Sequence, residues 1–324
     1  MNMRKIAELA GVSPATVSRV FNRNTGVNEE IAKKIRKIAS EYNYHPQISE
    51  KSKNVVLITP CNNVYSVQSC IDMLLMAVTG ILPEAGFRVE ILPLNSLERL
   101  PDIRFCAAVA IGIDPSMLPD WEETYNEPLI FLDRSPAGKK RGNNVFFVNS
   151  DEFSGMELAL THLKEQSCQK IGCIIHGKRG EGNTLLREKA VLEILKKLHL
   201  PDSPSLIQFS GEGSKRYVEL VGKLLKQGVD ALFCPGGNAG ITVLYALSLY
   251  GKKVPEDISL IASEQSFFSK YAVPPQTAVT QQYDLVAAAV VKVLQQSMSG
   301  TPVSAVTTLP YRLIHRESVR PELY

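Results

Sequence analysis

Two patterns of apolar residues divide the chain. In the first fifty residues apolar side chains recur at helical spacing, as at Ile6, Leu9 and Ala10. After Asn54, short apolar runs alternate with amphipathic segments, the pattern of strands followed by helices. The change of pattern predicts a helical domain, a short linker and a larger α/β domain, with boundaries at 1–46, 47–53 and 54–324.

The first domain is expected to hold three short helices. Asn2 can cap the first, and Gly11 can end it. Ser13 can cap the second, with Pro14 at the first helical position, where the missing N–H costs nothing. The third begins at Asn28 and is expected to bury a row of isoleucines, namely Ile31, Ile35 and Ile38.

The turn at 11–13 joins two short helices, a geometry that lets a second helix enter the major groove of DNA. Arg19 can fork onto guanine O6 and N7, while Ser18 and Asn22 can reach bases or phosphates. The alternative is a three-helix bundle with a solvated outer face. The outward face of the second helix comprises Pro14, Ala15, Ser18, Arg19 and Asn22.

A longer motif favours the DNA-binding interpretation. Residues 10–22 read Ala-Gly-Val-Ser-Pro-Ala-Thr-Val-Ser-Arg-Val-Phe-Asn, and Tyr-His-Pro follows at 44–46. This segment closely resembles the signature of the lactose/galactose repressor family. The resemblance implies a sequence-specific transcription regulator, a repressor that binds a palindromic operator on double-stranded DNA as a homodimer. It places Pro14, Ala15 and Arg19 at base-reading positions, and Asn2, Arg4, Ser18 and Asn22 near phosphates.

The linker departs from that family. Its members have a longer segment here, which forms a helix on DNA and wedges an apolar side chain into the minor groove. In residues 47–53 the only apolar candidate is Ile48. We therefore expect no kink by this route, and we expect Lys51 and Lys53 to contact phosphates.

The larger domain predicts parallel, doubly wound sheets. Strands are expected at Val55–Ile58, Val89–Leu92, Ala107–Ile111, Leu129–Leu132, Val145–Val148, Ile171–Ile175, Ala231–Cys234 and Ile258–Ile261. Helices are expected between most of them, near Ser69–Leu82, Glu152–Glu165, Leu185–Leu198 and Ile241–Tyr250. So many strands suit two sheets better than one, and in such folds ligands bind outside the carboxyl ends of strands.

The resemblance continues through this domain and implies two periplasmic-binding-protein-like lobes. It is carried by Leu129–Arg134, Val254–Ser259, Val273–Thr277 and the stretch from Leu309 to Ser318. The first lobe is expected at about 54–148 plus 282–304, and the second at about 149–281 plus 305–324. A first-lobe helix that the family has between 95 and 106 is shortened here. Helices at 71–81 and 285–294 are candidates for a dimer interface, although core packing explains them equally well.

The same resemblance predicts a small-molecule effector site. The expected contacts are Asp133, Arg187, Glu264, Tyr65 and Asn183. Two departures alter this site: Gly236-Gly237 replaces the usual Asn-Asp pair, and Glu264 replaces an aspartate. We favour a carbohydrate-derived effector. The loop 177–183, with Lys178 and Arg179 near Arg187, leaves an anionic effector open, as does regulation without any effector.

Composition and charge narrow the choice of function. Residues 1–53 carry ten basic and five acidic side chains, a net +5 that leaves −2 for the rest of the +3 chain. This suits a polyanion-binding head on a neutral body, although the lysines could also simply solvate a helix face. No apolar run is long enough for a membrane helix, and residues 1–5 lead into a polar amphipathic segment in place of an apolar signal core. A cytoplasmic protein is therefore expected, and an exported receptor is disfavoured.

Enzymatic and metal sites are not indicated. The six cysteines and five histidines are scattered without metal-ligand spacing, and most cysteines are expected to be buried. Asp133 and Glu264 could form a carboxylate pair, but no nucleophile or cofactor motif accompanies them. We therefore expect no catalytic residues and no cofactor.

Overall fold

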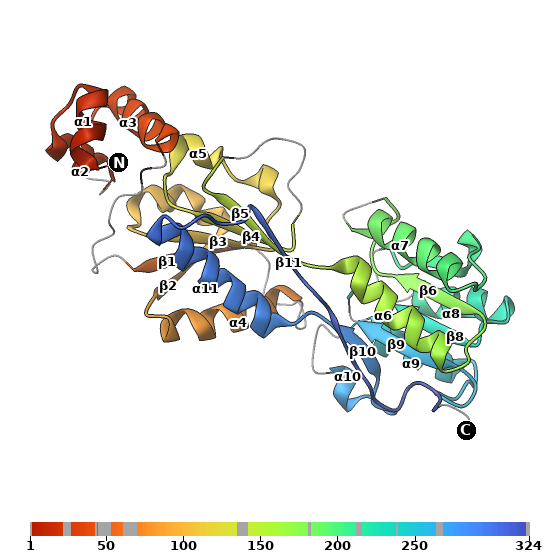
Figure 1. The fold of residues 1–324 in the computed structure, drawn as a ribbon. Helices are drawn as coiled ribbons and strands as arrows, with labels where there is room; N and C mark the ends of the chain where they lie inside the picture. The colour runs from red at the N-terminus through yellow and green to blue at the C-terminus, as the bar shows by residue number, and fades with distance from the viewer. Residues whose placement is uncertain are drawn as a thin grey trace. The chain divides into compact units, whose positions relative to one another are not determined.

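The computed structural model describes most of the chain (Figure 1), namely residues 2–21, 27–42, 44, 53–60, 70–134, 142–180, 183–211, 216–237, 239–263 and 268–321. These residues form two compact units. One contains the described parts of 1–66, 74–149 and 283–309, and the other contains those of 67–73, 150–282 and 310–324.

The helical head has the three expected helices, α1 (Met3–Ala10), α2 (Pro14–Phe21) and α3 (Glu29–Glu41). The predicted caps are confirmed. The Asn2 side chain accepts a hydrogen bond from the Lys5 N–H at 3.0 Å, and the Ser13 hydroxyl accepts one from the Thr16 N–H at 3.1 Å. Gly11 ends α1 in the left-handed conformation, at φ 71°.

The buried stripe of α3 differs from the prediction in part. Ile35 is buried as predicted and Ile38 is half-buried against the head core, but Ile31 is 38% exposed, and Ala32 and Ala39 are the other buried residues of the stripe. Residues 32, 35 and 39 lie within about 60° of one another on a helix, and residue 31 lies at the edge of that stripe. The two alanines allow α3 to pack closely on α1, which a row of isoleucines would not.

The first lobe is a six-stranded sheet in the order β11-β5-β4-β3-β1-β2. Its strands are β1 (Asn54–Thr59), β2 (Arg88–Pro93), β3 (Ala107–Ile111), β4 (Leu129–Leu132), β5 (Val145–Ser150) and β11 (Val306–Leu309). Figure 1 shows α4 (Cys70–Glu84) and α11 (Tyr283–Ser299) on one face. On the other face, α5 (Trp121–Thr124) and a 3-10 segment at Leu94–Asp102 pack on the core, in place of the shortened family helix.

The second lobe is a sheet in the order β12-β10-β9-β8-β6-β7. Its strands are β6 (Ile171–Ile175), β7 (Ile207–Phe209), β8 (Ala231–Cys234), β9 (Ser259–Ser263), β10 (Thr277–Thr280) and β12 (Arg312–Ile314). One face is covered by α6 (Glu152–Glu165) and α7 (Thr184–Lys197). The other is covered by α8 (Arg216–Lys226) and α9 (Ala239–Leu249), and a short helix α10 (Phe268–Tyr271) precedes β10.

Eight strands lie where the sequence predicts them, but four were missed: β7, β10, β11 and β12. β11 and β12 are short, and neither is fully buried: exposed and half-buried positions alternate in β11, and β12 begins at an exposed arginine. No continuous apolar run therefore marks them in the sequence. Because β11 lies beside β5, the first lobe extends to Leu309, beyond the expected crossing at 304–305. This occurs because the Phe147 N–H donates to the Ala305 carbonyl, drawing the segment onto the first sheet.

Most cysteines are buried, as predicted. Cys106, Cys168, Cys173 and Cys234 are core residues, Cys70 is half-buried, and Cys61 falls outside the described residues. Burial raises the pKa of Cys106 to about 12, so this thiol stays protonated at neutral pH.

Ser318 secures the carboxyl-terminal segment in the second lobe. Its fully buried hydroxyl donates to the Leu260 carbonyl at 2.5 Å and accepts from the Thr277 N–H at 2.8 Å. Ser318→Ala is expected to destabilise the protein by about 1–3 kcal/mol, because both backbone groups lose a buried partner. Urea unfolding measures this against Ser304→Ala, an exposed serine. Equal unfolding midpoints for the two variants would contradict the assignment.

Candidate nucleic-acid interface and ligand site

The outward face of α2 carries the predicted DNA-reading side chains. Pro14, Ala15 and Arg19 are exposed and Ser18 is half-buried, while Val17 and Val20 on the opposite side are buried in the head core. This division follows from the helical period, because residues 17 and 20 share the face turned towards α1 and α3. The face offers small side chains next to one forked cation, which suits close approach to base edges.

The structure describes three of the five remaining predicted DNA contacts. Asn2 and Arg4 are exposed at the start of α1, and the Asn2 oxygen is already used as the helix cap. Its amide N–H groups remain chemically able to donate to a phosphate. Lys53 is exposed directly before β1. Asn22 and Lys51 lie outside the described residues.

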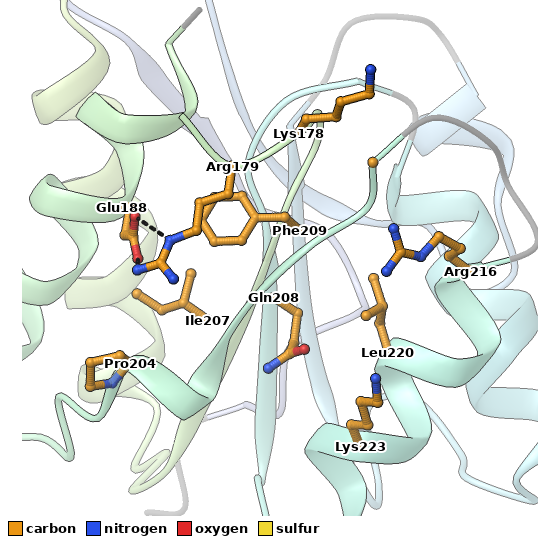
Figure 2. A pocket seen from close by; sticks show the side chains of 11 residues that line it. Lys178, Arg179, Glu188, Pro204, Ile207, Gln208, Phe209, Arg216, Leu220 and Lys223 are labelled. Carbon is orange, nitrogen blue, oxygen red and sulfur yellow. Dashed lines mark hydrogen bonds and ion pairs between the residues drawn. The ribbon is translucent and has the colours of Figure 1, made fainter. Parts of the chain in front are cut away.

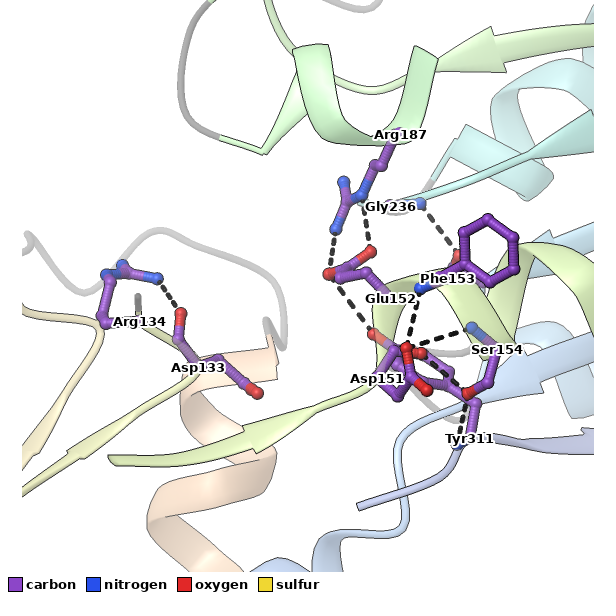
Figure 3. Close-up of polar contacts among 10 residues, drawn as sticks. Asp133, Arg134, Asp151, Glu152, Phe153, Ser154, Arg187, Gly236 and Tyr311 are labelled. Atoms are coloured by element: carbon purple, nitrogen blue, oxygen red, sulfur yellow. Dashed lines mark hydrogen bonds and ion pairs between the residues drawn. The ribbon is translucent and has the colours of Figure 1, made fainter. Parts of the chain in front are cut away.

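In the second lobe, Arg187 is held by a carboxylate that the sequence did not indicate (Figure 3). The Arg187 Nε lies 2.9 Å from Glu152 Oε2, and Nη2 lies 2.8 Å from Glu152 Oε1. The Tyr311 hydroxyl lies 3.4 Å from the same carboxylate. The Arg187 side chain is 14% exposed. Burial opposes its charge, but the bonds to Glu152 outweigh burial and raise the pKa of Arg187 above its ordinary value.

The two glycines after β8 leave space for this arrangement. Gly236 and Gly237 have φ values of 86° and 59°, in the region that favours glycine. A Cβ on Gly236 would collide with the Arg187 Nη1, and one on Gly237 would lie 2.6 Å from His176 Cγ. The Gly236 N–H donates to Ser263 Oγ at 2.9 Å. The absence of the family's Asn-Asp pair is therefore matched by two side chains that occupy its space.

His176 is a further polar side chain near Arg187 and Gly237. It follows β6 directly, and its Nδ1 lies 3.1 Å from the Tyr217 hydroxyl and 3.4 Å from Ser210 Oγ. Burial and the nearby Arg187 charge both lower the pKa of His176, which favours a neutral ring. His176 and Glu152 both come shortly after the carboxyl end of a predicted strand, where ligands bind in such folds. That placement is the sequence signal that could have identified them.

The other predicted effector contacts are placed as follows. Asp133 directly follows β4 in the first lobe at φ 49°, and its carbonyl accepts a hydrogen bond from the Arg134 guanidinium at 2.9 Å. Asn183 is exposed at the start of α7 in the second lobe. Tyr65 and Glu264 lie outside the described residues.

The basic residues of the 177–183 loop do not join Arg187. A pocket of about 400 Å³ runs along the edge strand β7, and Lys178 and Arg179 line it (Figure 2). Arg179 forks onto Glu188, at 2.6 Å from Nη2 to Oε1 and 3.2 Å from Nε to Oε2, and lies over the Phe209 ring. Because Glu188 follows Arg187 on α7, the two arginine pairs point in different directions. Closeness in sequence therefore does not create one anion site.

Comparison with known proteins decides the family. Residues 2–47 match the bacterial regulatory proteins of the lacI family, and residues 160–319 match a periplasmic binding protein-like domain. Together the two matches cover more than half of the chain. The chain belongs to the lacI family of transcription regulators. The family and the fold predicted from the sequence are thereby confirmed.

Several relatives of the lacI family match nearly end to end. The probable HTH-type transcriptional repressor ExuR of Bacillus subtilis is 26% identical over 86% of each chain. The ribose operon repressor of Halalkalibacterium halodurans is 24% identical, over 98% of this chain and 97% of its own. These homologues are transcriptional regulators.

Solved structures share the fold. The complex of the transcriptional regulator CelR with cellobiose superposes with a TM-score of 0.69 at 24% identity, covering 98% of this chain and 99% of that one. The lac repressor dimer bound to operator and the anti-inducer ONPF gives 0.67 at 20% identity, covering 98% of each.

Across the described residues, no three histidine, cysteine or acidic side chains gather as metal ligands would. None of the helices in the described part of the chain combines the length and apolar character that a bilayer crossing requires.

Proposed function

We propose that this lacI-family regulator is a cytoplasmic repressor that binds a palindromic operator as a homodimer. The observation that carries the proposal is the exposed face of α2, where Arg19 stands beside Ala15 and Ser18. One such head contacts few base pairs, so useful specificity requires two half-sites on a two-fold protein. We assign no catalytic residue, because the proposed activity is binding alone.

Exposed apolar side chains support a dimer through the first lobe. Met76 on α4 is 71% exposed and Leu285 on α11 is 41% exposed. Figure 1 shows these two helices on the same face of the first sheet. A second copy that covers this face would bury both side chains.

Genome-wide binding followed by a motif search tests the proposal. The expected result is an inverted repeat protected by a dimeric protein. A chain that is monomeric in solution and enriches no inverted repeat would refute it.

We further propose that a small carbohydrate-derived molecule controls DNA binding from the second lobe. It binds at the surface formed by Arg187, Glu152 and His176, which we call the Arg187 face. Such control requires a ligand with different affinities for the DNA-competent and DNA-incompetent states. The polar groups at this face support the site, and two similar proteins are named for sugars, the ribose operon repressor and the CelR–cellobiose complex. Sugars that change operator affinity in wild type, but not in Arg187→Ala, are the expected result.

The short linker leads to a separate prediction about DNA shape. Residues 47–52 lie outside the described residues, so the prediction rests on the sequence. Without a wedge, the operator is expected to stay nearly straight, because smooth bending of such a site costs on the order of 1–6 kcal/mol. Ile48→Ala should therefore change operator affinity little. A circular-permutation gel measures the bend, and a sharp central kink would contradict this prediction.

A further inference from the structure

We propose that Glu152 neutralises the Arg187 face of the second lobe and thereby restricts this face to uncharged, polyhydroxyl ligands. The inference rests on the proposed function, because it takes the Arg187 face as the effector site. It goes further by naming the residue that excludes anionic effectors such as sugar phosphates and sugar acids.

The geometry of the pair carries the first step. Glu152 binds Arg187 through both carboxylate oxygens, at 2.9 and 2.8 Å, which occupies the Nε and Nη2 donors of the guanidinium fork. The third nitrogen, Nη1, lies where a Cβ on Gly236 would be. The arginine charge is therefore matched by a full negative charge in contact with it.

An incoming anion would meet that carboxylate. To reach the guanidinium fork, a phosphate or carboxylate ligand must displace Glu152, whose side chain is only 24% exposed. Displacement would leave a largely buried carboxylate without its partner and close to a like charge, which is unfavourable. An uncharged ligand requires no such exchange.

Two neighbouring groups among the described residues that could attract an anion already have partners within the protein. The amino terminus of α6 is capped by the Asp151 carboxylate, which accepts the N–H groups of Phe153 and Ser154 at 3.1 and 3.2 Å. The nearest cation in sequence on the preceding loop, Arg179, is paired with Glu188 beside the β7 pocket.

The groups that remain suit hydroxyls. Arg187 Nη1 is a donor, the Glu152 oxygens retain acceptor lone pairs, and His176 offers a ring whose neutral form is favoured. A hydroxyl donates and accepts, so neighbouring hydroxyls of one ligand can use both kinds of group. Because a sugar presents several adjacent hydroxyls without net charge, it matches this face better than an anion.

Inorganic phosphate is a direct probe of the proposal. Thermal unfolding of the full-length chain is followed as phosphate replaces chloride at constant ionic strength. Wild type is expected to show no phosphate-specific stabilisation. Glu152→Gln keeps a hydrogen-bonding side chain and removes the charge, so it should bind phosphate at least about tenfold more tightly than the upper limit that the wild-type titration sets. The added stabilisation should disappear in the double variant E152Q/R187M.

Glu157→Gln is the matched control. It makes the same change on the same helix, in an ion pair with Lys197 whose side chains are 37% and 66% exposed. It should behave as wild type. The proposal is overturned if wild type is stabilised by phosphate through Arg187, or if folded Glu152→Gln gains no more than Glu157→Gln.

A measurement on wild type keeps the test independent of the variant's folding. The Nε–H resonance of Arg187, assigned with Arg187→Lys, is followed by NMR during titration with gluconate. An unmoved resonance supports the proposal, and a saturable shift overturns it. Operator binding without any added small molecule is measured separately, so failure of the proposed DNA-binding function is distinguishable from failure of this inference.

Discussion

Gly237→Ala is expected to destabilise the protein by about 2–4 kcal/mol. The residue has φ 59°, where an alanine costs on the order of 1–2 kcal/mol. Its new Cβ would also lie 2.6–2.8 Å from three ring atoms of His176. That ring cannot turn away freely because Tyr217 binds it at 3.1 Å, so overpacking adds roughly 1–3 kcal/mol.

Gly251→Ala separates the two contributions. Gly251 has a similar φ of 65°, but no atom lies within 4 Å of its Cβ position. This control should show the backbone cost alone, about 1–2 kcal/mol. Urea unfolding monitored by circular dichroism compares both variants with wild type. Equal losses of stability would show that His176 does not restrict residue 237.

Arg19→Ala is expected to weaken operator binding by about 1–3 kcal/mol and to relax the preference for one base pair in each half-site. Arg19 is exposed on the outward face of α2, where a forked guanidinium can bind a guanine edge. Lys5→Ala is the comparison. Lys5 is exposed on α1 and forms a 2.9 Å ion pair with Glu8. The Lys5→Ala variant should therefore lose at most one contact to a DNA phosphate.

Fluorescence anisotropy with matched and base-substituted operators distinguishes the two effects. Lys5→Ala should weaken binding to all sequences alike, with a smaller salt dependence. Arg19→Ala should weaken binding mainly to the preferred sequence. An Arg19→Ala variant with unchanged discrimination would exclude a base-reading role for this residue. Circular dichroism of both variants checks that the head remains folded.

The sequence by itself determined the head and the framework of the lobes. The caps at Asn2, Gly11 and Ser13 are local features, set by residues within three or four positions of each other. The inner strands of a parallel sheet are buried on both faces and therefore read as continuous apolar runs, as at Ala107–Ile111. Such signals need no knowledge of distant neighbours.

The edge strands escaped prediction because their burial depends on partners far along the chain. β11 alternates between exposed and half-buried positions and is recognisable only beside β5. The face of α3 was misjudged for a related reason. Isoleucine and alanine can both fill a helix interface, and only the distance between packed helices selects one of them.

The ligand site was decided by tertiary structure to a greater degree. The sequence indicated Arg187, but its partner Glu152 lies 35 positions away on another helix. It also placed Arg179 close to Arg187, whereas the fold directs each to a different carboxylate. Gly236 and Gly237 looked like a simple loss of side chains, and only the packed structure shows Arg187 and His176 in the space they leave. Charge balance at a buried site depends on which groups come within a few ångströms, and sequence proximity does not set those distances.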